Sequence, residues 1–206
     1  MLGWAIGNIG GADRRLRNYC VVGAILPDID AVPYIFGAKY YEHFHHTFGH
    51  NIFFWLLFTI WVGWKCASAR SWILGFLSFG SHLLTDAHFS GWKLYLFWPF
   101  SRVGFLFPNA VDLSHPSNIQ AMYVGFALVI LLAFRYQRTP IDVFSPKLDR
   151  LFVSFFRQKK LTCHLCRRRA NQLCSRCRQP VCLRHGLVKR DWEIFCPACA
   201  QEISTG

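Results

Sequence analysis

Histidine and aspartate recur at short spacings in the first half of this sequence. His82 and Asp86 are four residues apart within the run from Phe79 to Phe100. If that run is helical, both side chains lie on one face, one turn apart. A neutral imidazole beside a carboxylate suits a first-row divalent metal. Both groups would be costly among apolar neighbours unless they were paired or metal-bound, so the pair predicts a metal site.

Two further segments supply the same ligand types. The turn Pro27–Asp30, with the sequence PDID, carries two carboxylates, and the segment Tyr40–His50 is rich in histidine. Ionisable groups from three separate segments favour one shared divalent metal site in an apolar helical scaffold. The alternative is a loop of solvated histidines at an interface, together with one structural His–Asp hydrogen bond.

These segments define the expected site. The residues expected to be both metal ligands and catalytic groups are Asp28, Asp30, His45, His50, His82 and Asp86. We expect His46 and His88 to support those ligands or to bind substrate. The expected metal is a divalent ion, most simply zinc.

A second metal-binding pattern occupies the last fifth of the chain. It reads C-x2-C-x7-C-x2-C-x4-C-x2-H-x10-C-x2-C, which gives eight ligands in four close pairs. Such spacing predicts two closed tetrahedral zinc sites, and saturated sites of this kind are structural rather than catalytic. The ligands are Cys163, Cys166, Cys174, Cys177, Cys182, His185, Cys196 and Cys199. Thiolate ligands require a reducing compartment.

Composition separates the two patterns. The chain is 53% hydrophobic with a mean hydropathy of +0.23, which is too apolar for an ordinary soluble domain. Of its net charge of +12, residues 135–206 carry +10, from 15 Lys and Arg against 5 Asp and Glu. We therefore expect three parts: a membrane-embedded helical domain over 1–134, a basic amphipathic linker over 135–160, and a two-zinc module over 161–206.

The apolar segments predict an all-α membrane helical bundle, followed by a small zinc-stabilised module. Helices are expected over 51–64, 71–85 and 118–134, and the last of these has the composition of a membrane span; a buried core helix is the alternative. Basic residues between 65 and 70 and at Arg135 predict a multi-pass protein whose C-terminus is cytoplasmic. In the linker, apolar residues fall on one helical stripe and suit a helix that lies on the membrane or packs on the bundle. They are Leu148, Leu151, Phe152, Phe155 and Phe156.

The order of motifs over about residues 1–134 resembles the YdjM family of inner-membrane metal-dependent hydrolases. The motifs are PDID at 27–30, H-x4-H at 45–50, and H-x3-D at 82–86 followed by WPF at 98–100. The chain departs from the family pattern at His46, where the family has Arg, and at Gly49, where it has Thr. Relatives also carry a His before the first apolar stretch, so this ligand is either missing or lies upstream of Met1.

Two weaker resemblances extend this interpretation. The ligand types look similar to those of zinc-dependent phospholipase C and P1 nuclease, which implies hydrolysis of a phosphoester. The cysteine pattern resembles B-box and RING-like cross-brace fingers, which implies that pairs one and three share one zinc and pairs two and four the other. Sequential pairing stays open.

We therefore expect a membrane-bound metal-dependent hydrolase, with a phosphoester and possibly lipid-linked substrate, that carries a cytosolic zinc-binding interaction module. The alternative is a non-catalytic membrane adaptor that recruits a partner through the basic zinc finger. Expected partners are membrane lipid and a protein partner of the module. Nucleic acid is a weaker candidate, because no base-reading finger spacing is present.

Overall fold

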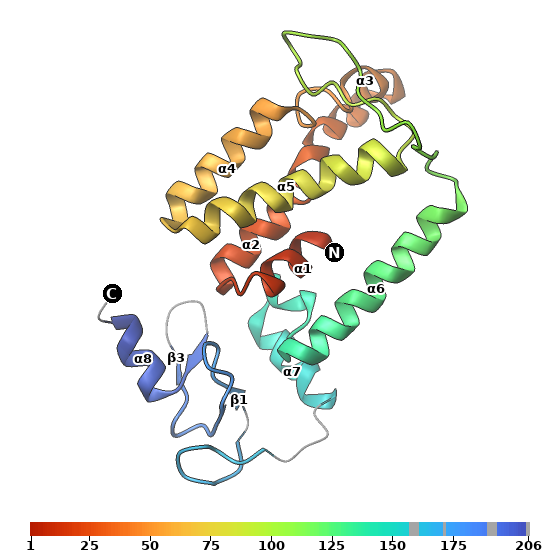
Figure 1. Cartoon of the computed structure of the whole chain (residues 1–206). Helices are drawn as coiled ribbons and strands as arrows, with labels where there is room; N and C mark the ends of the chain where they lie inside the picture. Colours follow the sequence, from red (N-terminus) through yellow and green to blue (C-terminus); the bar gives the residue numbers. More distant parts are fainter. Residues whose placement is uncertain (157–160, 171, 189–192, 205–206) are drawn as a thin grey trace. The chain divides into compact units, whose positions relative to one another are not determined.

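The computed structural model describes residues 1–156, 161–170, 172–188 and 193–204 (Figure 1). The chain forms two compact units, Met1–Tyr136 and Gln137–Gly206. The first unit is helical, and the second combines short helices with a cysteine-rich region of two-residue strands. The expected predominance of helix is therefore confirmed.

The first unit begins with α1 (Leu2–Ile9) packed on α2 (Arg14–Gly23). The helices approach closely at Gly3, where a Cβ would lie 2.2 Å from the carbonyl oxygen of Cys20. Asp13 caps α2, since its carboxylate accepts a hydrogen bond from the backbone N–H of Leu16 at 2.8 Å. The sequence is basic here, with Arg14, Arg15 and Arg17, and such a composition predicts an exposed surface. Arg17 is nevertheless buried and donates to the carbonyl of Ala12 at 2.8 Å.

Helices α4 (Ile52–Cys66) and α5 (Ala69–Phe89) lie side by side and form the largest contact in this unit (Figure 1). The chain turns between them at Ala67, which has a left-handed backbone, and Ser68 then caps α5 in a capping box. The buried core between α4, α5 and the N-terminal helices is apolar and aromatic. It is centred on Leu16, Cys20, Phe58, Val62, Leu74, Phe79 and Leu83.

The segment between α2 and α4 folds over one end of this helix pair. The PDID turn lies in a 3-10 helix, η1 (Leu26–Phe36), and is followed by α3 (Ala38–Phe44). Proline at positions 27 and 33 and the tight winding keep this stretch from continuing α2. Residues 90–115 are mostly irregular and contain an isolated bridge between Leu94 and Phe105.

Helix α6 (Pro116–Tyr136) is the one described helix that is long and apolar enough by itself to cross a membrane. Only 11% of its apolar window is buried, and it contacts α1. The bent pair α2–η1, with an angle of 48°, makes a second candidate if it forms one broken span. Helix α4 is apolar but has 15 residues, fewer than a lone span requires.

The second unit contains η2 (Pro140–Val143) and α7 (Pro146–Phe156), followed by the cysteine-rich region. Two antiparallel strand pairs form there. β1 (Gln172–Leu173) pairs with β2 (Pro180–Val181), and β3 (Leu187–Val188) pairs with β4 (Ile194–Phe195). Helix α8 (Pro197–Ser204) closes the unit. The buried side chains around Cys174 include Val181, Ile194 and Phe195. This core is small relative to the length of the cysteine-rich region.

Candidate metal centre and cysteine module

Four of the six expected ligands converge at one end of α5. The ligand atoms of Asp28, His50, His82 and Asp86 all lie within 4.8 Å of one another. Oδ2 of Asp86 is 3.0 Å from Nε2 of both His50 and His82. Oδ1 of Asp28 is 3.3 Å from Nε2 of His82 and 3.8 Å from Nε2 of His50.

Each element delivers its ligand for a local reason. His82 and Asp86 are one turn apart on α5 and so project from the same face. His50 precedes Asn51, which caps α4 by accepting a hydrogen bond from the N–H of Phe54 at 2.8 Å. Asp28 lies in the first turn of η1. The start of α4, the end of α5 and η1 therefore meet at this site.

The ring orientations of both histidines are fixed by their Nδ1 atoms. Nδ1 of His82 lies 2.9 Å from the carbonyl oxygen of Ala24, which can only accept a hydrogen bond. Nδ1 of His50 lies 2.9 Å from Oδ2 of Asp30. A neutral ring that donates from Nδ1 presents a lone pair at Nε2. Both Nε2 atoms therefore point toward the carboxylate oxygens of Asp28 and Asp86.

This arrangement fits a divalent cation. The buried Nε2 of His82 has no hydrogen-bond partner among the described residues, although two carboxylate oxygens are nearby. Two lone pairs facing two carboxylates repel unless a proton or a metal lies between them. Metal–ligand bonds of about 2.0–2.2 Å give ligand–ligand edges of about 3.3 Å in a tetrahedron. The observed separations of 3.0 to 3.8 Å match such edges.

Asp30 supports this site from behind His50. Its carboxylate is fully buried and accepts hydrogen bonds from the backbone N–H groups of Thr47 and Gly49, each at 3.1 Å. Its two oxygens also lie 2.9 Å from Nδ1 of His45 and Nδ1 of His50. The sequence suggests Asp30 and His45 as ligands beside the other four, but they group separately with His50. A carboxylate that meets four donors is well placed to orient a metal-binding imidazole.

His46 lies beside the four converging residues. It is buried, it adopts a left-handed backbone with φ of 65°, and its Nε2 lies 3.8 Å from Oδ2 of Asp86. Its Nδ1 is buried with no hydrogen-bond partner among the described residues. Burial, together with the neighbouring histidines, lowers the pKa of His46 to about 4, which keeps this ring neutral at physiological pH.

The remaining expected site residue, His88, lies elsewhere on α5. Six residues separate it from His82, which turns it to a different face of the helix. Its ring packs edge-on against Phe89 and Phe107, at centroid distances of 4.5 and 6.3 Å. It is not grouped with the ligand atoms of the site.

Aromatic residues line the side of the site formed by α3 and the 90–115 segment. Tyr41 stacks on His45 at 4.5 Å, and Trp92 lies 5.6 Å from His45 and 5.7 Å from His46. Burial, followed by the nearby carboxylates, raises the pKa of Tyr41. Sequence reasoning missed Tyr41, Trp92 and the carbonyl of Ala24. Tyr41 and Trp92 are aromatic residues close to histidines in the sequence, which could have suggested them. A backbone carbonyl is common to all residue types, so the sequence gives no indication of the role of Ala24.

The family comparison covers the part of the chain that forms this site. The family model for the YdjM inner membrane protein matches residues 2–146. The chain belongs to the YdjM inner membrane protein family. No curated protein and no solved structure matches the chain. Membership in the YdjM family supports an inner membrane location, and the match includes every residue of the site described above.

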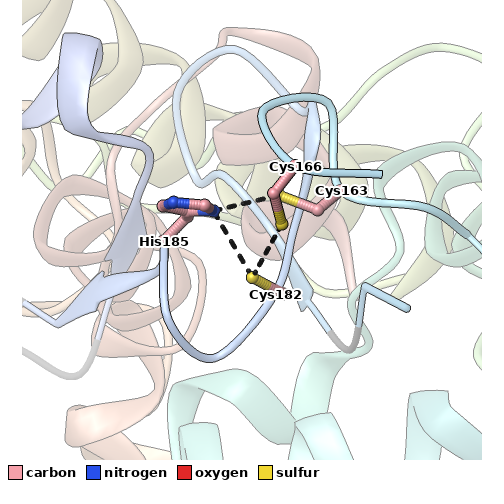
Figure 2. Close-up of side chains that lie close together, drawn as sticks. All are labelled: Cys163, Cys166, Cys182 and His185. Carbon is pink, nitrogen blue, oxygen red and sulfur yellow. Dashed lines mark hydrogen bonds between the residues drawn. The ribbon is translucent and has the colours of Figure 1, made fainter. Parts of the chain in front are cut away.

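The cysteine module lies beyond the YdjM match and contains two further groups of ligand type. Cys163 and Cys166 meet Cys182 and His185, as Figure 2 shows, and the remaining four ligands form the second group. That second group consists of Cys174, Cys177, Cys196 and Cys199. The chain therefore brings pair one to pair three, and pair two to pair four.

Distances within both groups suit zinc. Nδ1 of His185 lies 3.6 Å from Sγ of Cys163 and 3.5 Å from Sγ of Cys182, while the Sγ atoms of Cys166 and Cys182 are 3.7 Å apart. In the second group, the Sγ atoms of Cys177 and Cys196 are also 3.7 Å apart. Zn–S bonds of about 2.3 Å give S–S edges of about 3.8 Å in a tetrahedron. Both groups can hold a metal ion, and zinc fits the ligand set.

Proposed function

We propose that the helical unit is a membrane-bound metal-dependent hydrolase that acts on a phosphoester, with lipid-linked phosphoesters as the substrate class. The observation that carries this proposal is the convergence of two imidazole Nε2 atoms and two carboxylates from three separate segments, with all four ligand atoms within 4.8 Å of one another. Two neutral imidazoles and two carboxylates carry a charge of −2, which a divalent cation balances.

The residues around the proposed ion have two different roles. Asp28, His50, His82 and Asp86 hold it, and Asp30 fixes the ring of His50 through Nδ1. A divalent ion held there would acidify a water molecule and polarise a phosphoryl oxygen.

The site is open on one side, as catalysis requires. The side chain of Asp28 is 49% exposed, whereas that of His50 is fully buried. Substrate therefore approaches from the side of η1. Beside Asp86, at 3.8 Å from its Oδ2, neutral His46 offers a ring nitrogen that can exchange a proton with a reacting group.

The membrane setting favours a lipid-borne substrate. We place α6 across the bilayer and assign α4 and α5 to the same membrane region, because each exposes large apolar side chains such as Leu57 and Ile73. The basic connection at 65–70 and Arg135 then lie on the cytoplasmic side by the positive-inside tendency. This orientation makes the protein multi-pass and gives the cysteine module a reducing compartment.

For the cysteine module we propose a cross-brace finger of the B-box or RING-like type with two structural zinc ions. The grouping of alternate ligand pairs supports this arrangement over sequential pairing. With so small a core, the metals would supply much of the folding free energy of the module. Its task is then binding, with a protein as the first candidate partner.

Hydrolysis of lipid phosphoesters by the purified full-length protein tests the proposed activity. We expect turnover that a chelator abolishes and added zinc restores, and that Asp86→Asn lowers by about 100-fold or more. Glu42→Gln, which neutralises an exposed carboxylate on α3, is the matched control and should retain wild-type turnover. Turnover that survives both chelation and Asp86→Asn would remove the assigned mechanism.

A second function, that of a membrane adaptor, is favoured by the exposed basic surface of the module. Arg167, Arg168, Arg169 and Arg184 are all exposed next to the first ligand group. An adaptor would keep its cellular role in an Asp86→Asn variant and lose it when Cys163 and Cys182 are replaced by serine. An enzyme would lose its role in the Asp86→Asn variant.

A further inference from the structure

The geometry points to α7 as a membrane-surface helix, which lies in the plane of the bilayer and inserts its apolar face among anionic phospholipids. This inference is independent of the proposed enzymatic activity. It concerns the first helix of the second unit, Pro146–Phe156, and Phe144 just before it.

Much of the apolar face of α7 is exposed. Leu148 and Leu151 are about 60% exposed, Phe152 is 44% exposed and Phe144 is 87% exposed. At about 100° per residue, the three helical residues fall within roughly 100° of the helix circumference. Lys147 is exposed beside this stripe and adds a positive charge next to it.

Another side of α7 is fixed to its own unit. Asp149 is buried, and its Oδ1 accepts hydrogen bonds from the backbone N–H and the hydroxyl of Thr139, each at 2.7 Å. Helix α7 also packs on η2. Because this contact sets the rotation of the helix, the apolar stripe faces outward and is not free to turn into its own unit.

The chain itself keeps this face close to the bilayer. Helix α6, the membrane-span candidate, ends at Tyr136, and nine residues precede α7. Fully extended, they reach roughly 30 Å. Residues 137–206 contain 14 Lys and Arg against 5 Asp and Glu, and such an excess attracts an anionic membrane surface.

The described part of this face comprises four exposed residues, and the side chains of Phe155 and Phe156 lie outside the part of the chain that the structure describes. A tethered amphipathic helix requires little buried area, because the span already holds it at the membrane.

Photocrosslinking of the full chain tests this inference. The probe p-benzoylphenylalanine replaces Phe144 or Phe152 in turn, in vesicles of phosphatidylethanolamine and phosphatidylglycerol, and adducts are identified by mass spectrometry. The matched control places the probe at Ser154, an exposed position outside the apolar stripe. We expect lipid adducts at 144 and 152 in about tenfold excess over 154. Adducts to residues 1–136 or to a second copy of the chain, in place of lipid, would overturn the inference.

Trypsin accessibility gives a measurement that does not depend on the probe. In the same vesicles, cleavage after Lys147 and Arg150 should be slow in the wild type. It should be about tenfold faster in Leu148→Gln/Leu151→Gln, which stays anchored by α6 and adds no acidic residue beside the cleavage sites. Equal cleavage rates would argue against insertion. In vesicles of phosphatidylcholine alone we expect faster cleavage of the wild type, and an unchanged rate would remove the role of anionic lipid.

Discussion

Nε2 of His50 lies 3.0 Å from Oδ2 of Asp86, although 36 positions separate the two residues. The same oxygen lies 3.0 Å from Nε2 of His82, which precedes Asp86 by one turn on α5. One carboxylate oxygen thus joins a local helical pair to a distant loop. When no ion is bound, burial acts to lower the pKa of His50, but its hydrogen bonds to Asp30 and Asp86 outweigh burial and raise it.

Replacement of His82 and Asp86 should remove a metal ion. We expect the His82→Ala/Asp86→Ala variant of the full-length protein to contain about one ion per chain fewer than the wild type, since it lacks half of a four-ligand set. Elemental analysis after gel filtration measures the difference, and Glu42→Gln should match the wild type. Equal metal content in the double variant would show that the four residues hold no ion.

Asp30→Asn should weaken metal binding without abolishing it. The amide keeps the size of the carboxylate but loses the negative charge that polarises the ring of His50. We expect affinity to fall by about 10–100-fold, with full occupancy recovered at high metal concentration. Competition titration with a chromophoric chelator measures this. A loss of stoichiometry at saturation would instead make Asp30 a direct ligand.

Gly49→Ala should destabilise the helical unit. A Cβ at this position would lie 2.0 Å from the carbonyl oxygen of Pro27, a backbone atom that cannot move aside alone. We expect a loss of about 1–3 kcal/mol, typical of overpacking, measured by thermal unfolding in detergent. Gly125→Ala on α6 is the control, since its nearest neighbour is Cε of Met1 at 3.6 Å. Equal stability of the two variants would contradict the contact.

Paired cysteine substitutions distinguish the two zinc arrangements. Cys163→Ser/Cys182→Ser removes two ligands of one observed group, so one tightly bound zinc should remain. Cys163→Ser/Cys174→Ser damages both groups, so neither site should keep tightly bound zinc. Sequential pairing predicts the opposite result: one zinc would remain in Cys163→Ser/Cys174→Ser, and neither site would keep zinc in Cys163→Ser/Cys182→Ser. Zinc release after mild chelation, read with a metallochromic dye, separates the two, and Cys66→Ser in the helical unit serves as the control.

The Asp149 carboxyl should make stability depend on pH. Burial raises its pKa above the ordinary value, and the nearby Asp142 adds to this. The folded state therefore binds a proton more tightly than the unfolded state does. Stability from this group is greatest below about pH 4 and decreases as the pH rises through the raised pKa.

Replacement of Asp149 isolates this effect. Asp149→Asn keeps an acceptor for Thr139 without the buried charge, so the variant should unfold at a higher temperature than the wild type near neutral pH. The difference should shrink toward about pH 4, where the wild-type carboxyl is protonated. Thermal melts of both proteins across this range provide the measurement, and a constant difference would refute the titration.

Local patterns in the sequence account for much of this architecture. The apolar run expected over 118–134 forms α6, with ends at Pro116 and Tyr136. The four-residue spacing of His82 and Asp86 is a property of any helix, so their shared face could be predicted. The close spacing of the two ligands in each pair of the cysteine module is likewise visible in the sequence, so two zinc sites could be predicted.

Other features depend on packing between distant segments. Arg17 belongs to a stretch whose composition predicts a basic surface, but the chain folds back and buries it against Ala12. Asp30 and Asp28 are equivalent in the PDID motif, yet one is fully buried and the other is half-exposed. Only the rotation of η1 against the 45–51 loop decides which carboxylate faces the two Nε2 atoms.

The alternation of ligand pairs in the cysteine module has a consequence for its history. Along the chain the pairs belong in turn to the first group, the second, the first and the second. No single cut between Cys163 and Cys199 leaves a whole site on each side. A gene rearrangement could therefore not divide this segment into two working halves, and the module can be gained, exchanged or lost only as one piece.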